Sequence, residues 1–517
     1  MYRRRAEGNL LLQAIIAATS GVLLTLALPP TLLWPAALAL VPLFVLVADS
    51  AGFRRAFSLG FWFALGFFSL YLLWLPASLS QPGWLGPLFW LLYPPLLLIL
   101  ASFWGLATGL SRLVGGRGRS TLLLLPAAWV LTELLRSLGY FAFPWGTLGY
   151  LWLDTPVAQL ADLIGVNGLS LLTVTAAALL AAPFVPAVNR PRRDRSLYAV
   201  AAAVLLVAGA WAAGAVHEPQ LPEPDRSVLL VQPNLDPFGR LGTPDGDLLI
   251  QTTLTAEATA NSAEAPDLIV WPEGSLIGLP VEGPAGTDVR SQIQATSPGT
   301  PFVVAGRGES EAGAHNRAWL LQDGQLNASY DKTVLVPFGE TWPLMDRLEG
   351  PYRFAFGLLN MGLLQDTAPG SSRPALPVAA ENPFSVGVYI CYESVFPQVS
   401  ADLVRDGASV LINITNDAWF ARGNGARQHY DMGRMRAIET RRYVLRSGID
   451  GITGIVNPRG ESVSELPRNI ADTLTGQFTV SSELTPYVRH GQLIWWLLPL
   501  WLVLGSAGRL VVHGVPD

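Results

Sequence analysis

The sequence predicts a helical membrane bundle joined to a layered α/β domain. Two observations favour this fold class. Only 14% of the 517 residues are charged and 50% are hydrophobic, whereas a soluble protein carries about 25% charged residues. The apolar runs also change in length, from roughly 20 residues before residue 217 to about five to eight residues between 218 and 489.

The long apolar runs predict transmembrane helices, because a helix that crosses a bilayer needs about 20 mostly apolar residues. Seven candidates precede residue 217 and an eighth lies near the end of the chain. They cover residues 10–28, 32–47, 57–75, 85–110, 121–135, 165–184, 197–216 and 493–512. Further spans follow the first one closely, so we do not expect a cleavable signal peptide. The bundle should therefore contain about eight helices.

The arginines predict the orientation of these helices. Twelve of them precede the first span or follow the second, fourth and sixth spans: Arg3, Arg4, Arg5, Arg54, Arg55, Arg112, Arg117, Arg119, Arg190, Arg192, Arg193 and Arg195. The alternate loops contain only Arg136. Positive charge marks cytoplasmic loops, so both termini should be cytoplasmic in the inner membrane of a bacterium. We expect a membrane region over 1–216, a periplasmic domain over 217–489, and a final helix with a short tail over 490–517.

The periplasmic segment has the pattern of a layered α/β domain. Short apolar runs typical of buried strands recur at residues 227–231, 267–271, 302–305, 318–321, 385–390, 409–414 and 451–456. Residues 428–446 predict a helix with many arginines on its polar faces, and residues 218–224 resemble a proline-rich linker. Strands that alternate with helices favour a layered arrangement.

Composition narrows the chemistry of this domain. The net charge of -5 and the absence of a basic, aromatic-rich module argue against a nucleic-acid partner. Cys391 is the only cysteine, which excludes an intramolecular disulfide and a CxxC metal site. A lone cysteine is commonly a small core residue. Lys332 is the only lysine beside 33 arginines. Its position suggests a chemical need for an amine with an adjustable pKa, and the alternative is an accident of composition.

Two motifs place charged side chains beside predicted strands. Glu273 follows the strand at 267–271, and sites in α/β sheets form at the carboxyl ends of strands. Lys332 precedes an apolar run, where a fixed cation could stabilise an oxyanion. Glu340 follows a glycine turn and either accepts hydrogen bonds in the site or lies exposed. Alternatively, Glu273 is a surface turn residue and Lys332 is a surface lysine with a buried stem.

The third motif takes a predicted strand directly into Cys391, Tyr392 and Glu393. This arrangement is similar to a nucleophile elbow, in which a strand end displays the attacking side chain. A thiol nucleophile needs a base or a cation to form its reactive thiolate. None of the three motifs contains histidine, and His315 and His429 are the nearest candidates in the domain. A carboxylate base with a lysine is therefore favoured over a Cys–His pair.

Taken in this order, Glu273, Lys332 and Cys391 resemble the Glu–Lys–Cys triad of the nitrilase superfamily, whose members fold as an α-β-β-α sandwich. Within that superfamily the chain is most similar to the bacterial apolipoprotein N-acyltransferase family, which adds a bundle of eight membrane helices. The shared segments are 143–146, 231–234, 271–273, 336–340, 391–393 and 416–420. The chain departs from the family pattern at Val334, where histidine is common, and at residues 449–451, where Asn-Thr-Gly is common.

The resemblance implies an acyltransferase that takes an acyl chain from a membrane phospholipid through a thioacyl intermediate on Cys391. The acceptor would be the α-amino group of the N-terminal diacylglyceryl-cysteine of an apolipoprotein. Glu273 would be the general base, and Lys332 would stabilise the oxyanion. No metal or other cofactor is implied, and we expect a monomer. Supporting roles would fall to Glu340, Tyr392 and Glu393, and possible substrate contacts to Trp145, Trp342 and Trp419.

Two alternatives remain open at this point: a membrane-tethered amidase or nitrilase-type hydrolase, and a catalytically inactive lipid-binding scaffold. A further hypothesis concerns residues 342–364, which carry Phe354, Phe356, Leu359 and Met361. They are either an amphipathic lid that reaches towards lipid or an ordinary packed insertion.

Overall fold

The structure is a computed structural model that describes residues 2–79, 86–185, 193–235, 242–342, 344–358, 367–420 and 423–513. The chain divides into two compact units. One unit comprises Met1–Glu218 with His490–Asp517, and the other comprises Pro219–Arg489.

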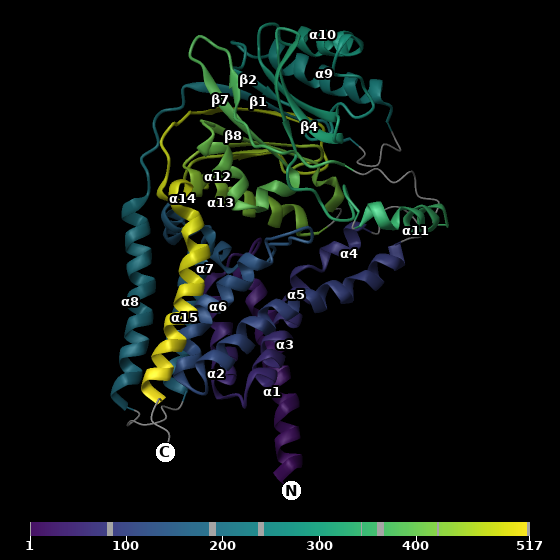
Figure 1. The fold of residues 1–517 in the computed structure, drawn as a ribbon. Coiled ribbons are helices and arrows are strands. Elements are labelled where there is room, and N and C mark those ends of the chain that lie inside the picture. Colours follow the sequence, from purple (N-terminus) through teal and green to yellow (C-terminus); the bar gives the residue numbers. More distant parts are fainter. Residues whose placement is uncertain are drawn as a thin grey trace. The chain divides into compact units, whose positions relative to one another are not determined.

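The first unit is helical (Figure 1). Each of the eight predicted apolar segments contains a helix. The helices are α1 (Tyr2–Leu24), α2 (Leu40–Asp49), α3 (Phe53–Tyr71), α4 (Trp74–Leu79), α5 (Gly86–Gly115), α6 (Arg119–Leu135), α7 (Ala161–Ala181), α8 (Arg193–His217) and α15 (Ile494–His513). Within the described residues, four stretches are long and apolar enough to cross a membrane: Leu10–Ala27, Trp90–Gly115, Pro156–Phe184 and Leu197–His217. The prediction of a membrane protein holds, and the count of eight spans stays a prediction.

Small residues allow the helices of this unit to approach closely. A Cβ atom at Gly21 would lie 1.9 Å from the Phe63 carbonyl oxygen, and one at Gly66 would lie 2.2 Å from the Ala18 carbonyl oxygen. Helices α1 and α3 therefore pack backbone to backbone, as small residues permit in membrane bundles. Trp129 on α6 packs 4.6 Å from the Trp104 ring on α5, measured between ring centroids.

The second unit is a sandwich of two six-stranded sheets. The first sheet has the order β12-β1-β2-β3-β4-β5 and the second has the order β11-β10-β9-β8-β7-β6. The strands are β1 (Arg226–Gln232), β2 (Leu268–Val270), β3 (Phe302–Ser310), β4 (Gly313–Gln322), β5 (Gln325–Asp331), β6 (Leu376–Val378), β7 (Phe384–Ile390), β8 (Val410–Thr415), β9 (Val444–Gly448), β10 (Gly454–Val456), β11 (Ser462–Glu465) and β12 (Asp472–Phe478).

Helices cover the outer faces of both sheets (Figure 1). Helices α9 (Pro244–Ala260) and α10 (Thr287–Ala295) pack on the first sheet, and α12 (Pro397–Arg405) and α13 (Gly425–Thr440) pack on the second. The sheets face each other, and the Ser447 hydroxyl on β9 donates to the Val231 carbonyl on β1 at 2.8 Å. This is the α-β-β-α arrangement that the resemblance implied.

The central strands are apolar throughout because both of their faces are covered. On β1, Leu229 and Val231 belong to the core beneath α9 and α10, together with Trp271 and Ile293. Strands β1, β2 and β3 run parallel, as do β7, β8 and β9. Their carboxyl ends therefore meet at one edge of each sheet, where loops can bring distant residues together.

The predicted helix over residues 428–446 was wrong at its end and in its exposure. Helix α13 ends at Thr440 because Arg441 takes a left-handed φ of 51°, and β9 begins at Val444. Two of its arginines, Arg434 and Arg436, are buried, with Arg436 at 0% exposure, whereas Arg427 is partly exposed. Arg434 pairs with Asp431 at 3.2 Å inside the domain. The periodicity of the sequence shows that the arginines share a face of the helix. It cannot show that buried carboxylates such as Asp431 pair with them inside the domain.

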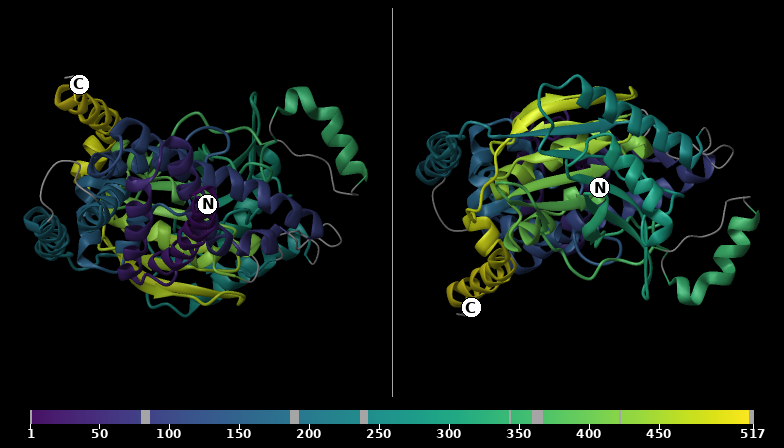
Figure 2. Two further views of the ribbon diagram at one scale, coloured as in Figure 1. Left: turned by 90° about the horizontal axis from the view of Figure 1, so that it is seen from below. Right: turned by 90° about the horizontal axis from the view of Figure 1, so that it is seen from above.

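Part of the proposed lid segment is helical. Helix α11 (Met345–Leu358) stands clear of both sheets in Figure 2. Phe354 on this helix is 74% exposed. Residues 359–366, which include Leu359 and Met361, and the side chain of Phe356 lie outside the described part of the chain.

Candidate active site

Glu273 is held at the carboxyl end of β2 by the residues that precede it. Trp271 is fully buried in the core, and its indole nitrogen donates to the Thr255 hydroxyl on α9 at 3.1 Å. Pro272 ends the strand, and Gly274 provides the left-handed turn that follows, with a φ of 72°. The carboxylate is 11% exposed. A glutamate at this point is fixed by the core rather than displayed on the surface.

Lys332 follows β5 and lies between two carboxylates. Its Nζ atom is 2.8 Å from Glu340 Oε1 and 3.3 Å from Glu273 Oε1, and its side chain is only 1% exposed. Burial alone would lower the pKa of Lys332, but the Glu273 and Glu340 carboxylates together raise it above its usual value. The ammonium is therefore a permanent cation at neutral pH. Glu340 accepts hydrogen bonds within this group and is not simply a surface residue.

Asn316 joins the two carboxylates and did not figure in the sequence prediction. Its Nδ2 atom on β4 donates to Glu273 Oε1 at 2.8 Å and to Glu340 Oε1 at 2.9 Å. Its backbone carbonyl accepts from the Lys332 amide at 2.9 Å. Asparagine is uncommon inside strands, which is the one sequence signal that could have marked it.

Cys391 begins a sharp turn at the end of β7. Its φ of 49° is left-handed, and a short 3-10 helix runs over Cys391–Val395. The side chain is partly exposed. Burial and then the Glu273 carboxylate raise the pKa of the thiol, while Lys332 and the Thr415 hydroxyl oppose that rise less strongly. The resting thiol is therefore protonated at neutral pH and needs a proton acceptor when it attacks.

Glu393 connects the cysteine turn, Cys391–Val395, to the lysine loop, which begins at Lys332 after β5. Its Oε1 atom accepts from the Thr333 amide at 2.8 Å, the Thr333 hydroxyl at 2.7 Å, the Val334 amide at 3.1 Å and the Tyr330 hydroxyl at 2.7 Å. Its Oε2 atom accepts from the Ile390 amide at 2.8 Å. The carboxylate is 1% exposed. These bonds fix the segments on either side of Lys332 and Cys391 relative to each other.

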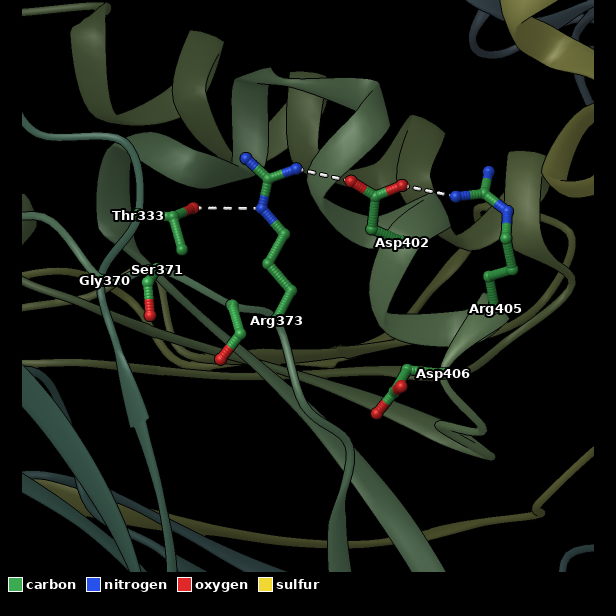
Figure 3. Close-up of a pocket in the computed structure, with 8 residues that line it drawn as sticks. Thr333, Gly370, Ser371, Arg373, Asp402, Arg405 and Asp406 are labelled. Carbon is green, nitrogen blue, oxygen red and sulfur yellow. Dashed lines mark hydrogen bonds and ion pairs between the residues drawn. The ribbon is translucent and has the colours of Figure 1, made fainter.

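A polar cavity of about 520 Å³ lies beside the lysine loop (Figure 3). Arg373 bridges its wall, because its Nε atom donates to the Thr333 hydroxyl at 3.0 Å and its Nη1 atom pairs with Asp402 at 2.5 Å. Arg405 pairs with the other oxygen of Asp402. The arginine at position 373 therefore supports the same threonine that binds Glu393.

His429, one of the two candidate histidines named from the sequence, lies behind the cysteine turn. Its Nε2 atom is 3.0 Å from the Cys391 carbonyl oxygen, and its Nδ1 atom is 3.0 Å from Asp417 Oδ1. Asp417 also pairs with Arg446 at 2.5 Å. Burial opposes the ionisation of Asp417, but Arg446 and then His429 hold its pKa well below the usual range. His429 therefore contacts the backbone of the turn at Cys391. The two carboxylates that flank Lys332, Glu273 and Glu340, lie on other elements.

The three tryptophans have different surroundings. Trp419 is 48% exposed, whereas Trp342 is partly buried and packs 5.4 Å from the Tyr352 ring. Trp145 belongs to the first unit, where it is 1% exposed and stacks on Phe143 at 4.9 Å. Tyr392 is 7% exposed and packs on Phe396. A contact with substrate stays a prediction for all three tryptophans.

The described residues contain no group of three or more His, Cys, Asp or Glu side chains placed to hold a metal ion. The charged groups gathered here are a cation between two carboxylates and a thiol influenced by one of those carboxylates and by the cation. Such a set can move a proton from the thiol to a carboxylate and can stabilise an oxyanion. That is the chemistry of acyl transfer through a covalent thioester.

Comparison with known proteins covers both units. Residues 20–179 match the family model of the apolipoprotein N-acyltransferase N-terminal domain, and residues 230–485 match that of carbon-nitrogen hydrolase. The apolipoprotein N-acyltransferase of Allorhizobium ampelinum is 32% identical, with 95% of this chain and 94% of the relative covered. That of Azotobacter vinelandii is also 32% identical, with 92% and 91% covered. Among solved structures, an amidase from Nesterenkonia sp. matches 54% of this chain and 98% of its own length at 17% identity, with a TM-score of 0.38.

Proposed function

This chain belongs to the apolipoprotein N-acyltransferase family, and on that basis we propose that Glu273, Lys332 and Cys391 carry an acyl chain from a phospholipid to an apolipoprotein. The chain is an acyltransferase that N-acylates apolipoproteins. The acceptor in our proposal is the α-amino group of an N-terminal diacylglyceryl-cysteine. The main support for these roles is the position of Lys332, whose ammonium lies between the Glu273 and Glu340 carboxylates.

In the first half-reaction the Cys391 sulfur attacks the ester carbonyl of the phospholipid. Glu273 takes the thiol proton, because its effect on the pKa of the thiol is larger than that of Asp417, the other carboxylate that acts on it. Negative charge develops on the former carbonyl oxygen, and Lys332 stabilises it together with the Tyr392 backbone N–H. The C–O ester bond breaks, the leaving alkoxide receives the proton from Glu273, and a lysophospholipid departs. The acyl chain remains on sulfur as a thioester.

In the second half-reaction the α-amine of the lipoprotein attacks the thioester carbonyl. Glu273 accepts the amine proton, and Lys332 again faces the oxyanion. The C–S bond breaks and the proton returns to the Cys391 thiolate, which restores the enzyme. Splitting the exchange of an ester for an amide into two steps lowers each barrier. Glu340 and Asn316 hold Glu273 and Lys332 in place throughout.

The placement of the enzyme in the membrane is part of the same proposal. Eight helices cross the inner membrane of a bacterium, both termini are cytoplasmic, and the sandwich unit faces the periplasm. The support is the arginine distribution along the chain. Both proposed substrates are lipids of that membrane, so an anchored enzyme meets them without extracting them into water.

Acyl trapping on Cys391 tests the proposal. Purified enzyme is incubated with phospholipid of one defined acyl chain, and its intact mass is measured. We expect the mass to rise by one acyl group on wild-type enzyme and not on Cys391→Ser. Adding a diacylated lipopeptide with a free amine should remove the adduct and yield an amide. Free fatty acid without amide would favour the hydrolase alternative, and the absence of any adduct would contradict the proposed mechanism.

A further inference from the structure

His429 is a buried histidine that the proposed chemistry does not use. It lies on α13, its exposed fraction is 0%, and its ring lies against Phe420 with centroids 5.4 Å apart. Core histidines commonly satisfy their two nitrogens with whatever polar groups are nearby. This one contacts the backbone carbonyl of the nucleophile at 3.0 Å. That contact connects α13 directly to the residue on which the reaction depends.

The partners of His429 determine which ring nitrogen donates. Asp417 is ionised, since Arg446 and His429 hold its pKa low, and its Oδ1 atom lies 3.0 Å from Nδ1. Arg446 Nη2, which can only donate, lies 3.1 Å from the same nitrogen, so Nδ1 has one charged group of each sign beside it. The Cys391 carbonyl oxygen can only accept, so Nε2 donates to it. The Ser394 hydroxyl, 2.7 Å from Nε2, serves as a second acceptor for the same N–H.

The contact of His429 with the Cys391 carbonyl oxygen also fixes the direction of the Tyr392 N–H, because both groups belong to one peptide unit. A peptide unit is planar and trans, so its C=O and its N–H point in opposite directions. A carbonyl held towards α13 turns the Tyr392 N–H away from α13. Cys391 also has a left-handed φ of 49°, a conformation that residues other than glycine rarely adopt without support from their surroundings. A donor on the carbonyl side supplies such support.

We infer that His429 is a positioning residue for acylation: it holds the Cys391–Tyr392 peptide so that the Tyr392 N–H faces the developing oxyanion. The inference rests on the proposed function, because only an acyl transfer develops that oxyanion. Asp417 in turn orients the imidazole, and Arg446 and the Thr415 hydroxyl orient Asp417 at 2.5 and 2.8 Å. The chain of contacts runs from the second sheet through α13 to the turn.

Two substitutions separate the contact with Cys391 from the contact with Asp417. The longer side chain introduced by His429→Gln would place an amide N–H near the position of Nε2, whereas His429→Asn would place one near Nδ1 only. We therefore expect His429→Asn to slow formation of the thioacyl enzyme by about 100-fold, the usual effect of losing one oxyanion donor. His429→Gln should stay within about tenfold of wild type. The apparent KM for phospholipid should not change in either variant.

Alkylation of Cys391 by iodoacetamide provides a readout that a merely structural role would not produce. Alkylation forms no oxyanion, and Cys391 is the only cysteine in the chain. We expect His429→Asn to alkylate at the wild-type rate while it acylates slowly. Tyr430→Phe is the matched control, because Tyr430 is the next residue on α13 and its hydroxyl pairs with Ser462 at 2.6 Å. It should acylate at the wild-type rate.

The outcomes are distinguishable. Equal acylation rates for the Asn and Gln variants, or a parallel loss of alkylation and acylation, would overturn the role of His429. A wild-type enzyme that forms no thioacyl adduct would instead overturn the proposed function. Ser394→Ala leaves His429 unchanged and should keep the wild-type acylation rate. A loss of tenfold or more at an unchanged melting temperature would show that Nε2 serves Ser394, and the inference would fail.

Discussion

The Glu393 carboxylate accepts a hydrogen bond from the Thr333 backbone amide at 2.8 Å. This bond joins the residue after the lysine to the residue two positions after the cysteine. Together with the bonds from Val334 and Ile390, it makes Glu393 the common acceptor of both loops. The separation of cation and nucleophile therefore depends on a side chain that has no chemical step of its own.

Replacing Glu393 by Gln should damage both stability and acylation. The amide nitrogen of glutamine would face donors, so at least one buried N–H would lose its acceptor, at a cost of about 1–3 kcal/mol. We expect a lower melting temperature and acyl-enzyme formation slowed by about 10- to 100-fold. Thermal unfolding and intact-mass kinetics measure these effects. Glu257→Gln on the exposed face of α9 is the control and should change neither. An active, fully stable Glu393→Gln enzyme would contradict the assignment.

Asn316→Asp should produce an enzyme that works better in acid. The substitution places a third carboxylate against Glu273 and Glu340, which are 2.8 and 2.9 Å from the asparagine nitrogen. Repulsion would displace Glu273 at neutral pH, and we expect acylation to fall by about 10- to 100-fold. Protonation of one carboxylate restores a donor, so the rate should recover as the pH falls. Asn316→Ala cannot regain a donor and should stay slow at every pH. Identical pH profiles for the two variants would argue against this role.

Glu273→Gln should change alkylation and acylation of Cys391 in opposite directions. The Glu273 carboxylate raises the pKa of the thiol, second only to burial. Removing its charge lowers that pKa, so more thiolate exists at a given pH and iodoacetamide should react faster between about pH 7 and 10. Acylation should nearly cease because the proton acceptor is lost. Glu340→Gln is the matched control and should change alkylation less. Slower alkylation of Glu273→Gln would show that the carboxylate assists the thiol in another way.

Asp450 should make the sandwich unit less stable as the pH rises. Burial raises the pKa of Asp450 to about 6, despite the opposing effect of Arg468. The folded state therefore holds this proton more tightly than the unfolded chain, whose value is near 3.8. The free energy of unfolding should fall between about pH 4 and 6, by at most about 3 kcal/mol. Asp450→Asn should remove this dependence in thermal unfolding scans. Asp323→Asn in the exposed turn before β5 should leave the dependence intact.

Phe354→Ser tests the lid hypothesis. The side chain is 74% exposed on α11. Exposure of an apolar ring to water is unfavourable, whereas its contact with lipid is favourable. We expect slower turnover of phospholipid in bilayers, an unchanged melting temperature, and normal acylation by a short-chain ester dissolved in water. Phospholipid turnover equal to that of wild type would favour an ordinary insertion.

The sequence by itself predicted the two units and the chemical groups of the proposed site. Long apolar runs and short ones demand different environments, so hydropathy separates the membrane bundle from the sandwich. Glu273, Lys332 and Cys391 were identified because each follows or precedes a buried strand, and strand ends converge at a sheet edge. Because Lys332 and Cys391 are the only lysine and the only cysteine in the chain, no other residue of either type could take their place in the prediction.

Only the tertiary structure decided which residues support that site. Asn316 reaches Glu273 because β3 pairs with both β2 and β4, and His429 reaches Cys391 because α13 packs behind the turn. The end of α13 at Thr440 and the burial of Arg436 likewise depend on partners elsewhere in the chain. Local periodicity records which face of an element is apolar. Hydrogen bonds between elements depend on sheet register and on packing angles, which no local pattern in the sequence encodes.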